Sequence, residues 1–235
     1  MNWYSISSPF FASSFPNFST STSISVLLFL KNDEPQVIYT DDEIKFKDEY
    51  EKLNGTELSD NYILKAINID SDNNVKYVSD DEILNVLTNG TNVIYFGWPD
   101  CNWCRTMLPI LISTLKENNV DTLYYYNFKS LRTAYEENND EKKVKLYEDI
   151  INIIGKDIET VFDEDSKRSG EKKMLAPTVV FIKNGNYIGL HFKTVDSQTD
   201  ASSKLTKEEE EELKKKYKTL IESINNNVCV ENEGC

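Results

Sequence analysis

The pair Cys101 and Cys104 is the feature that most restricts what this chain folds into. An apolar run at residues 93–98 comes just before the pair, and a helix-like stretch at residues 105–116 follows it. Two thiols three positions apart at the start of a helix close a disulfide with little backbone movement. The helix N-terminus also favours a thiolate on the first cysteine. The pattern predicts thiol–disulfide exchange, although the same spacing also suits zinc.

The chain's 235 residues suffice for one domain with a sizeable core plus extensions. From about residue 32 onward, its mixture of apolar and charged residues is typical of a soluble globular protein. The formal net charge is −14, and no basic stripe is present that would release counterions from a phosphate backbone. We therefore expect no nucleic-acid partner.

The four cysteines form two close pairs that are far apart in sequence, Cys101 with Cys104 and Cys229 with Cys235. This number is too small for a small domain held together by disulfides. The single histidine, His191, excludes a zinc site made of two cysteines and two histidines. A zinc site made of all four cysteines stays open as an alternative, and it requires the tail to fold back onto the first pair.

The first 31 residues are rich in Ser, Phe and Thr, and their first charged side chain is Lys31. The apolar run at residues 24–30 is far shorter than the ~20 residues that a membrane span needs. A secretory signal requires a Lys or Arg near its N-terminus, and none precedes this apolar run. An export or anchor segment is favoured over a disordered tail or a mis-assigned start. We expect membrane contact only if residues 1–31 anchor the protein.

Strands and helices alternate through most of the chain, and capping residues mark several of their ends. The first half of the pattern predicts a helix at 40–54, an irregular polar arm at 55–72, a strand at 75–78, a helix from Ser79 to Asn89 and a buried strand at 92–97. A helix from the cysteine pair to about 118 and a strand at 122–128 follow. The rest predicts a mostly helical segment at 129–173, strands at 178–183 and 187–194, and a last helix from a capping box at Thr206. Alternation of this kind predicts a parallel core, and Asn184-Gly185 predicts a closing antiparallel hairpin.

The helical segment at 129–173 has an apolar face and is expected to pack on the domain. Two roles stay open for it, a lid that selects partners beside the cysteine pair or a passive addition. The apolar face consists of Val144, Leu146, Tyr147, Ile150, Ile151 and Ile154.

Several motifs recur at the spacing of a known family. Pro109 follows the second cysteine by five positions, and Ala176-Pro177-Thr178 opens the predicted hairpin. Together with the cysteine pair after a strand, these motifs make the chain resemble the thioredoxin superfamily over roughly residues 73–227. Further matching positions are Phe96, Arg105 and Lys183-Asn184-Gly185.

The resemblance implies a three-layer α/β fold, in which a central mixed sheet has helices on both faces. It implies that Cys101 is the nucleophile and Cys104 the resolving thiol, with no bound cofactor. It also implies a cis peptide bond at Pro177 that faces the cysteines and leaves the Ala176 backbone free to pair with an extended substrate. Around this domain (73–228, with the insert at 129–173) we expect a leader or disordered segment at 1–35, an N-terminal extension at 36–72 and a cysteine-bearing tail at 229–235.

More narrowly, the chain looks like the thioredoxin-like proteins of Gram-positive bacteria that carry an N-terminal extension and a C-terminal cysteine pair. Some of these are described as bacteriocin transport accessory proteins. The resemblance implies protein thiols or disulfides as substrates and a separate redox partner protein. Trp98 and Trp103 are candidate substrate contacts that form an apolar rim, although Trp98 alternatively packs on the fold.

The chain departs from the thioredoxin pattern close to the cysteines. Tyr95 stands where the family has a buried Asp, and Gly97 stands where it has a Trp. Tyr95 is either a hydrogen-bonding partner of Cys104 or simply a core residue. Asp100 precedes the first cysteine directly, and its carboxylate opposes a second anion nearby.

Cys229 and Cys235 are expected to form a local disulfide, with a second redox pair as the alternative. A disulfide in the tail favours an extracytoplasmic location over a cytoplasmic one. The sequence thus predicts a thiol–disulfide oxidoreductase acting on proteins. A non-catalytic accessory protein for secretion and a four-cysteine zinc protein are the alternatives.

Overall fold

The computed structural model describes residues 39–59 and 61–225. Contacts divide the chain into residues 1–37 and residues 38–235, and all described residues belong to the second unit. The predicted leader at 1–35 and the tail cysteines Cys229 and Cys235 lie outside the described residues.

A five-stranded mixed sheet forms the centre of this unit, in the order β3-β5-β4-β6-β7. Strands β3 and β4 run parallel to β5, whereas β6 runs antiparallel to β4 and β7 antiparallel to β6. The predicted mixed α/β fold class is therefore confirmed, and the order is that of a thioredoxin-like fold. The strands are β3 (Val75–Tyr77), β4 (Asn92–Phe96), β5 (Leu123–Tyr126), β6 (Thr178–Lys183) and β7 (Asn186–Phe192).

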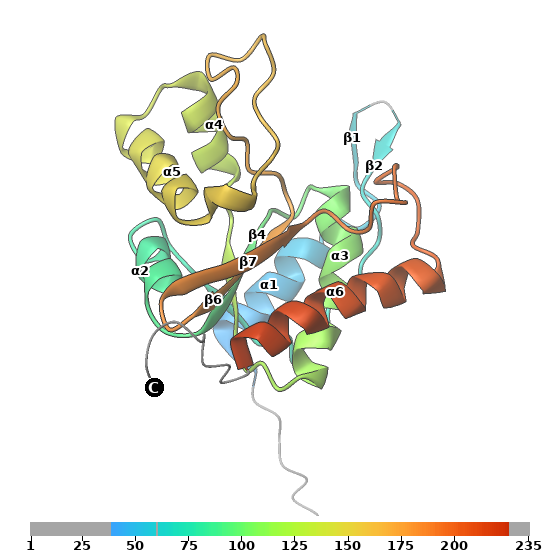
Figure 1. Ribbon diagram of the computed structural model, residues 1–235. Helices are drawn as coiled ribbons and strands as arrows, with labels where there is room; N and C mark the ends of the chain where they lie inside the picture. The colour runs from blue at the N-terminus through green and yellow to red at the C-terminus, as the bar shows by residue number, and fades with distance from the viewer. Residues whose placement is uncertain (1–38, 60, 226–235) are drawn as a thin grey trace, which may run out of the picture. The chain divides into compact units, whose positions relative to one another are not determined.

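Helices cover both faces of the sheet and complete the three layers (Figure 1). One face carries α1 (Asp41–Glu51), α3 (Asn102–Glu117) and α6 (Lys207–Asn225), and the other carries α2 (Ile83–Thr88), α4 (Lys129–Glu137) and α5 (Glu141–Ile154). Side chains alternate along β4 accordingly. The Tyr95 hydroxyl reaches Tyr50 of α1, whereas the Phe96 ring packs against Phe128 beside α4.

Helix α1 shares the core of the sheet, although it belongs to the predicted N-terminal extension. Its Phe46 and Tyr50 side chains are fully buried, and both rings contact Tyr125 of β5 at centroid distances of 4.9 and 6.2 Å. Burying each of these side chains contributes about 1.5–3 kcal/mol to stability. A capping box between Thr40 and Glu43 begins the helix.

The segment after α1 differs from its prediction as an irregular arm. It contains a short hairpin of β1 (Glu57–Ser59) and β2 (Tyr62–Ile63), whose side chains are all exposed. Without a buried face, these residues lack the apolar alternation that predicts a strand. Helix α1 also ends at Glu51, before a turn in which Gly55 has a φ of +71°.

Two capping predictions have different outcomes. Helix α2 begins at Ile83, later than the predicted cap at Ser79. The Ser79 hydroxyl donates to the Glu82 carboxylate and does not cap a backbone amide of this helix. The capping box of α6 is confirmed. The Thr206 N–H donates to the Glu209 carboxylate at 2.8 Å, and the Glu209 N–H donates to the Thr206 hydroxyl at 3.2 Å.

The predicted helical insert contains α4, α5, a short 3-10 turn (Gly155–Asp157) and a connection to β6. The apolar face of α5 is buried at Leu146, Tyr147, Ile150 and Ile154. The Met174 N–H donates to the Tyr147 hydroxyl at 2.8 Å, so the connection is fastened to the same helix. Among the helices of the described part, none combines the length and apolarity that crossing a membrane requires.

Candidate active site

The two neighbouring cysteines lie where β4 leads into α3. Cys101 is the N-cap residue of α3, and its sulfur accepts a hydrogen bond from the Cys104 N–H at 3.3 Å. Both cysteines are free thiols, of which Cys101 is 7% exposed and Cys104 fully buried. The helix therefore directs backbone amides at the first sulfur and places the second beneath it.

The predicted proline bend lies next to the first sulfur, although 75 positions separate the two in sequence. The Ala176–Pro177 peptide bond is cis. The Cys101 thiol donates to the Ala176 carbonyl at an S–O distance of 3.6 Å. Strand β6 begins directly after this bend, and pairing of β6 with β4 holds the two segments side by side. The structure thus brings Cys101, Cys104, Ala176 and Pro177 together.

The two thiols differ in their electrostatics. Hydrogen bonding from Cys104 lowers the pKa of Cys101 below the usual value for a thiol, with the backbone amides of Cys104 and Trp103 assisting. Burial and the Asp100 carboxylate act in the opposite direction. Burial raises the pKa of Cys104 well above its usual value. Cys101 is therefore the thiol suited to attack, and Cys104 stays protonated until a later step.

The predicted tryptophan rim is only partly present. Trp98 is 8% exposed, its ring lies 5.1 Å from that of Phe128, and the Arg132 guanidinium lies 4.6 Å from its centroid. Trp98 therefore packs on the fold and offers no apolar rim to a substrate. Trp103 is partly exposed, with the Lys193 ammonium 6.0 Å from its ring centroid.

Asn102, between the two cysteines, ties the active-site helix to the N-terminal extension. It is 1% exposed, and its side chain accepts from the Lys65 N–H at 2.9 Å and donates to the Ile63 carbonyl at 3.0 Å. The Asn102 N–H donates to the Tyr62 hydroxyl at 3.3 Å. No pattern in the sequence indicates this contact, because a lone Asn in a helix is usually exposed.

Arg105 is a second such tie, and it is a buried cation. It is 2% exposed and donates to the carbonyls of Tyr50 at 2.9 Å, Pro99 at 3.0 Å and Lys65 at 2.5 Å, and to the Asn54 side-chain oxygen. All four acceptors are neutral. Among the described residues no carboxylate forms an ion pair with it, so its charge favours an anion nearby.

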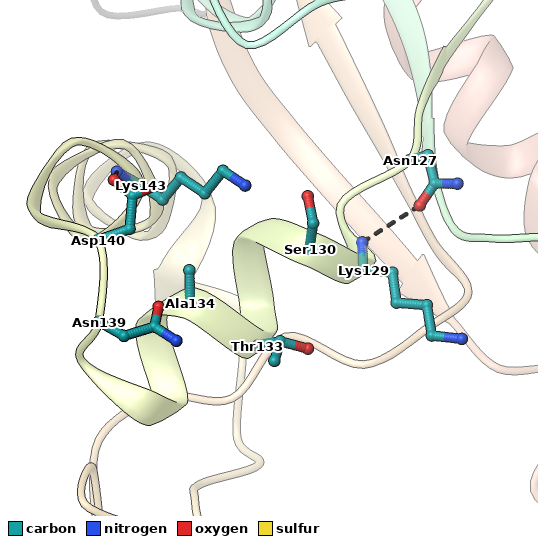
Figure 2. A pocket seen from close by; sticks show the side chains of 8 residues that line it. All are labelled: Asn127, Lys129, Ser130, Thr133, Ala134, Asn139, Asp140 and Lys143. Atoms are coloured by element: carbon teal, nitrogen blue, oxygen red, sulfur yellow. Dashed lines mark hydrogen bonds between the residues drawn. The ribbon is translucent and has the colours of Figure 1, made fainter.

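The helical insert also contacts the loop that precedes Cys101. Lys129, the first residue of α4, forms an ion pair with Asp100. Figure 2 shows Lys129 at one end of a polar hollow of about 590 Å³ on the insert. The hollow is lined by Asn127, Lys129, Ser130, Thr133, Ala134, Asn139, Asp140 and Lys143. Lys129 connects this hollow to the loop before Cys101 through its ion pair with Asp100.

Replacing Asp100 with Asn is expected to lower the pH at which Cys101 becomes a thiolate, because the carboxylate raises the pKa of that thiol. Lys129→Met is expected to shift this midpoint in the opposite direction, since it leaves Asp100 without its ion pair. Alkylation of Cys101 by iodoacetamide across a pH series, followed by peptide mass spectrometry, measures both midpoints. Equal midpoints in the two variants would contradict the assignment.

Within the described ranges, no group of three or more His, Cys, Asp or Glu side chains is arranged to hold a metal ion. The four-cysteine zinc site depends on Cys229 and Cys235, which lie outside those ranges. His191, expected on the strand surface, is half-buried under α6. Its ring donates to the Thr194 carbonyl oxygen at 2.7 Å and meets the Tyr217 ring edge-on.

No known family model and no curated protein sequence matches this chain. Among solved structures, thioredoxin O1 from Arabidopsis thaliana in the oxidized state aligns with 66% of this chain and with 100% of its own length. The sequence identity is 19% and the TM-score is 0.36. A likeness at this level carries no argument about chemistry, and the thioredoxin-like fold rests on the strand order and helix layers described above.

Proposed function

We propose that this protein exchanges thiols and disulfides with protein substrates through Cys101 and Cys104. The observation that carries this proposal is the position of the Cys101 sulfur. It caps the N-terminus of α3, its pKa is lowered, and it lies 3.6 Å from the carbonyl that precedes Pro177. In this position the nucleophilic sulfur lies beside a stretch of backbone that can pair with an extended substrate chain.

The chemistry proceeds in two exchanges. The Cys101 thiolate attacks a substrate disulfide, a new S–S bond forms, and the leaving substrate sulfur takes the electron pair and a proton from water. The Cys104 thiolate then attacks the Cys101 sulfur, forms the Cys101–Cys104 disulfide and releases the second substrate sulfur. The same steps in reverse oxidise a substrate dithiol. A redox partner protein returns the cysteines to their starting state in either direction.

The surroundings of Cys101 support a protein as the substrate. The Cys101 sulfur lies 3.6 Å from the Ala176 carbonyl oxygen, and Trp103, between the two cysteines, is partly exposed. The β1–β2 hairpin lies near Asn102, because the Tyr62 hydroxyl accepts from the Asn102 N–H. Exposed apolar side chains on this hairpin are Leu58, Tyr62 and Ile63. Apolar surface beside a reactive sulfur favours a polypeptide partner over a small thiol.

Cys104→Ser is expected to trap a mixed disulfide on Cys101, since the resolving thiol is then missing. Insulin is a suitable disulfide-bearing substrate, and non-reducing electrophoresis with peptide mass spectrometry identifies the linkage. The control is the double variant Cys101→Ser/Cys104→Ser, which keeps Cys229 and Cys235. A folded Cys104→Ser protein that forms no adduct would contradict the proposal and favour a non-catalytic accessory role. An adduct that persists in the double variant would contradict it by placing the reactive sulfur at Cys229 or Cys235.

A location outside the cytoplasm and a disulfide between Cys229 and Cys235 stay predictions from the sequence. Both concern parts of the chain outside the described residues. The proposed exchange depends on neither, because its nucleophile and its resolving thiol both lie at the start of α3.

A further inference from the structure

The second exchange poses a physical problem that the first does not, and the inference drawn from it rests on the proposed function. Cys104 must lose its proton before it attacks, yet its sulfur is fully buried, and burial disfavours an anion. The titratable groups that surround this thiol come from six elements or loops. They are Cys101, Arg105, Tyr50, Tyr62, Tyr95, Tyr125 and Tyr217.

Tyr95 is the hydroxyl group placed to stabilise that anion. It is fully buried on β4, and its hydroxyl lowers the pKa of the Cys104 thiol, which acts against the effect of burial. Its ring stacks on Tyr125 at a centroid distance of 5.3 Å and an interplanar angle of 19°. A Cβ at Gly97 would overlap the Tyr95 hydroxyl, so the glycine leaves the space that the hydroxyl fills. The position of this hydroxyl is therefore fixed by its neighbours.

A hydrogen bond between Tyr50 and Tyr95 orients the Tyr95 hydroxyl group. The two hydroxyl oxygens are 2.8 Å apart in the buried interior. When Tyr50 donates to Tyr95, the Tyr95 proton is left to point at the Cys104 sulfur. Both tyrosines have pKa values raised by burial, so both remain protonated donors at physiological pH. A chain of donors in a buried setting strengthens each of its bonds.

Arg105 completes the arrangement from α3 itself. Its guanidinium donates only to neutral acceptors, one of which is the Tyr50 carbonyl. Its positive charge is thus held inside the protein next to the cysteine pair, without a carboxylate partner among the described residues. A negative charge on Cys104 meets both a hydrogen-bond donor and a cation.

We propose that Tyr95 is a catalytic residue of the second exchange, donating a hydrogen bond to the Cys104 thiolate while that sulfur attacks Cys101. Tyr50 and Arg105 are positioning residues for it. The Cys104 proton passes to water, and Tyr95 keeps its own proton throughout. An S–S bond forms between Cys104 and Cys101, the bond from Cys101 to the substrate breaks, and the released substrate sulfur takes a proton from water.

Tyr95→Phe removes the hydroxyl and keeps the ring. Oxidised glutathione serves as the probe, because quenched mass spectrometry separates formation of the glutathione adduct on Cys101 from its resolution. We expect adduct formation to change by less than about threefold. We expect resolution to slow about tenfold, the size expected for losing one hydrogen bond to a charged group, and its pH midpoint to rise.

Tyr217→Phe is the matched control. It also removes one fully buried hydroxyl from the same side of the sheet, but that hydroxyl has no hydrogen-bond partner within the described part of the chain. Resolution is expected to be unchanged in this variant. Tyr50→Phe provides a second test that leaves Tyr95 in place, and it is expected to slow resolution about threefold through the lost donor.

Equal resolution rates and pH midpoints in Tyr95→Phe and the unaltered protein would overturn the role of Tyr95. So would an equal slowing by Tyr95→Phe and Tyr217→Phe, because the effect would then be structural. If the unaltered protein forms no glutathione adduct on Cys101, the proposed exchange itself fails at its first step, before Tyr95 is involved.

Discussion

Replacing Cys101 with Ser is expected to lower the rate of disulfide exchange by at least about 10³-fold, because the thiolate is the nucleophile and a serine hydroxyl does not ionise at neutral pH. The substitution is close to isosteric at a site that is 7% exposed, so the fold is expected to persist. Reduction of insulin in the presence of dithiothreitol, followed by turbidity, measures the rate.

The matched variant is Cys104→Ser, which keeps the attacking sulfur and loses only the resolving one. It is expected to form adducts at the rate of the unaltered protein while failing to turn over. Should Cys101→Ser retain more than about a tenth of the original rate, the reactive sulfur lies elsewhere in the chain, and Cys229 and Cys235 become the candidates.

Arg105→Met is expected to lower the free energy of unfolding by about 3 kcal/mol or more. Methionine fills most of the volume, but it leaves the carbonyl oxygens of Tyr50, Pro99 and Lys65 without this donor, and an unsatisfied buried acceptor costs about 1–3 kcal/mol. The midpoint and slope of denaturant unfolding, followed by circular dichroism, measure the loss.

Arg132→Met is the control for removing an arginine. Its guanidinium stacks on Trp98 at 4.6 Å and is only partly buried, so the expected loss is about 1 kcal/mol or less. Equal losses in the two variants would show that the bonds of Arg105 contribute no more than a single stacked contact. Resolution of the glutathione adduct by Cys104 supplies a second readout in Arg105→Met, and it is expected to require a higher pH because the cation near the Cys104 thiolate is lost.

The features that local patterns encode were predictable. Asn184-Gly185 predicts the hairpin between β6 and β7, and the apolar run before Cys101 predicts the buried strand that ends at the active-site helix. The meeting of Cys101 with Pro177 followed from a resemblance carried by several motifs at once. None of these depends on knowing which distant side chain fills a particular space.

Contacts between distant segments account for what was not predicted. Trp98 is buried because Arg132 and Phe128, some thirty positions later, cover its ring. The sequence raised Tyr95 both as a partner of Cys104 and as a plain core residue, and local periodicity does not separate the two. The Tyr95 hydroxyl occupies the space that the absent Gly97 side chain leaves, and this fit arises only when β4 is folded.

The place of α1 in the core decides how this chain can be shortened. A fragment that starts at residue 73 keeps every strand of the central sheet, but it lacks Phe46 and Tyr50 and three of the four oxygen acceptors of Arg105. Its sheet would present bare aromatic rings to water, a surface that promotes self-association. The smallest portion of this chain that retains the described interior therefore starts near residue 39.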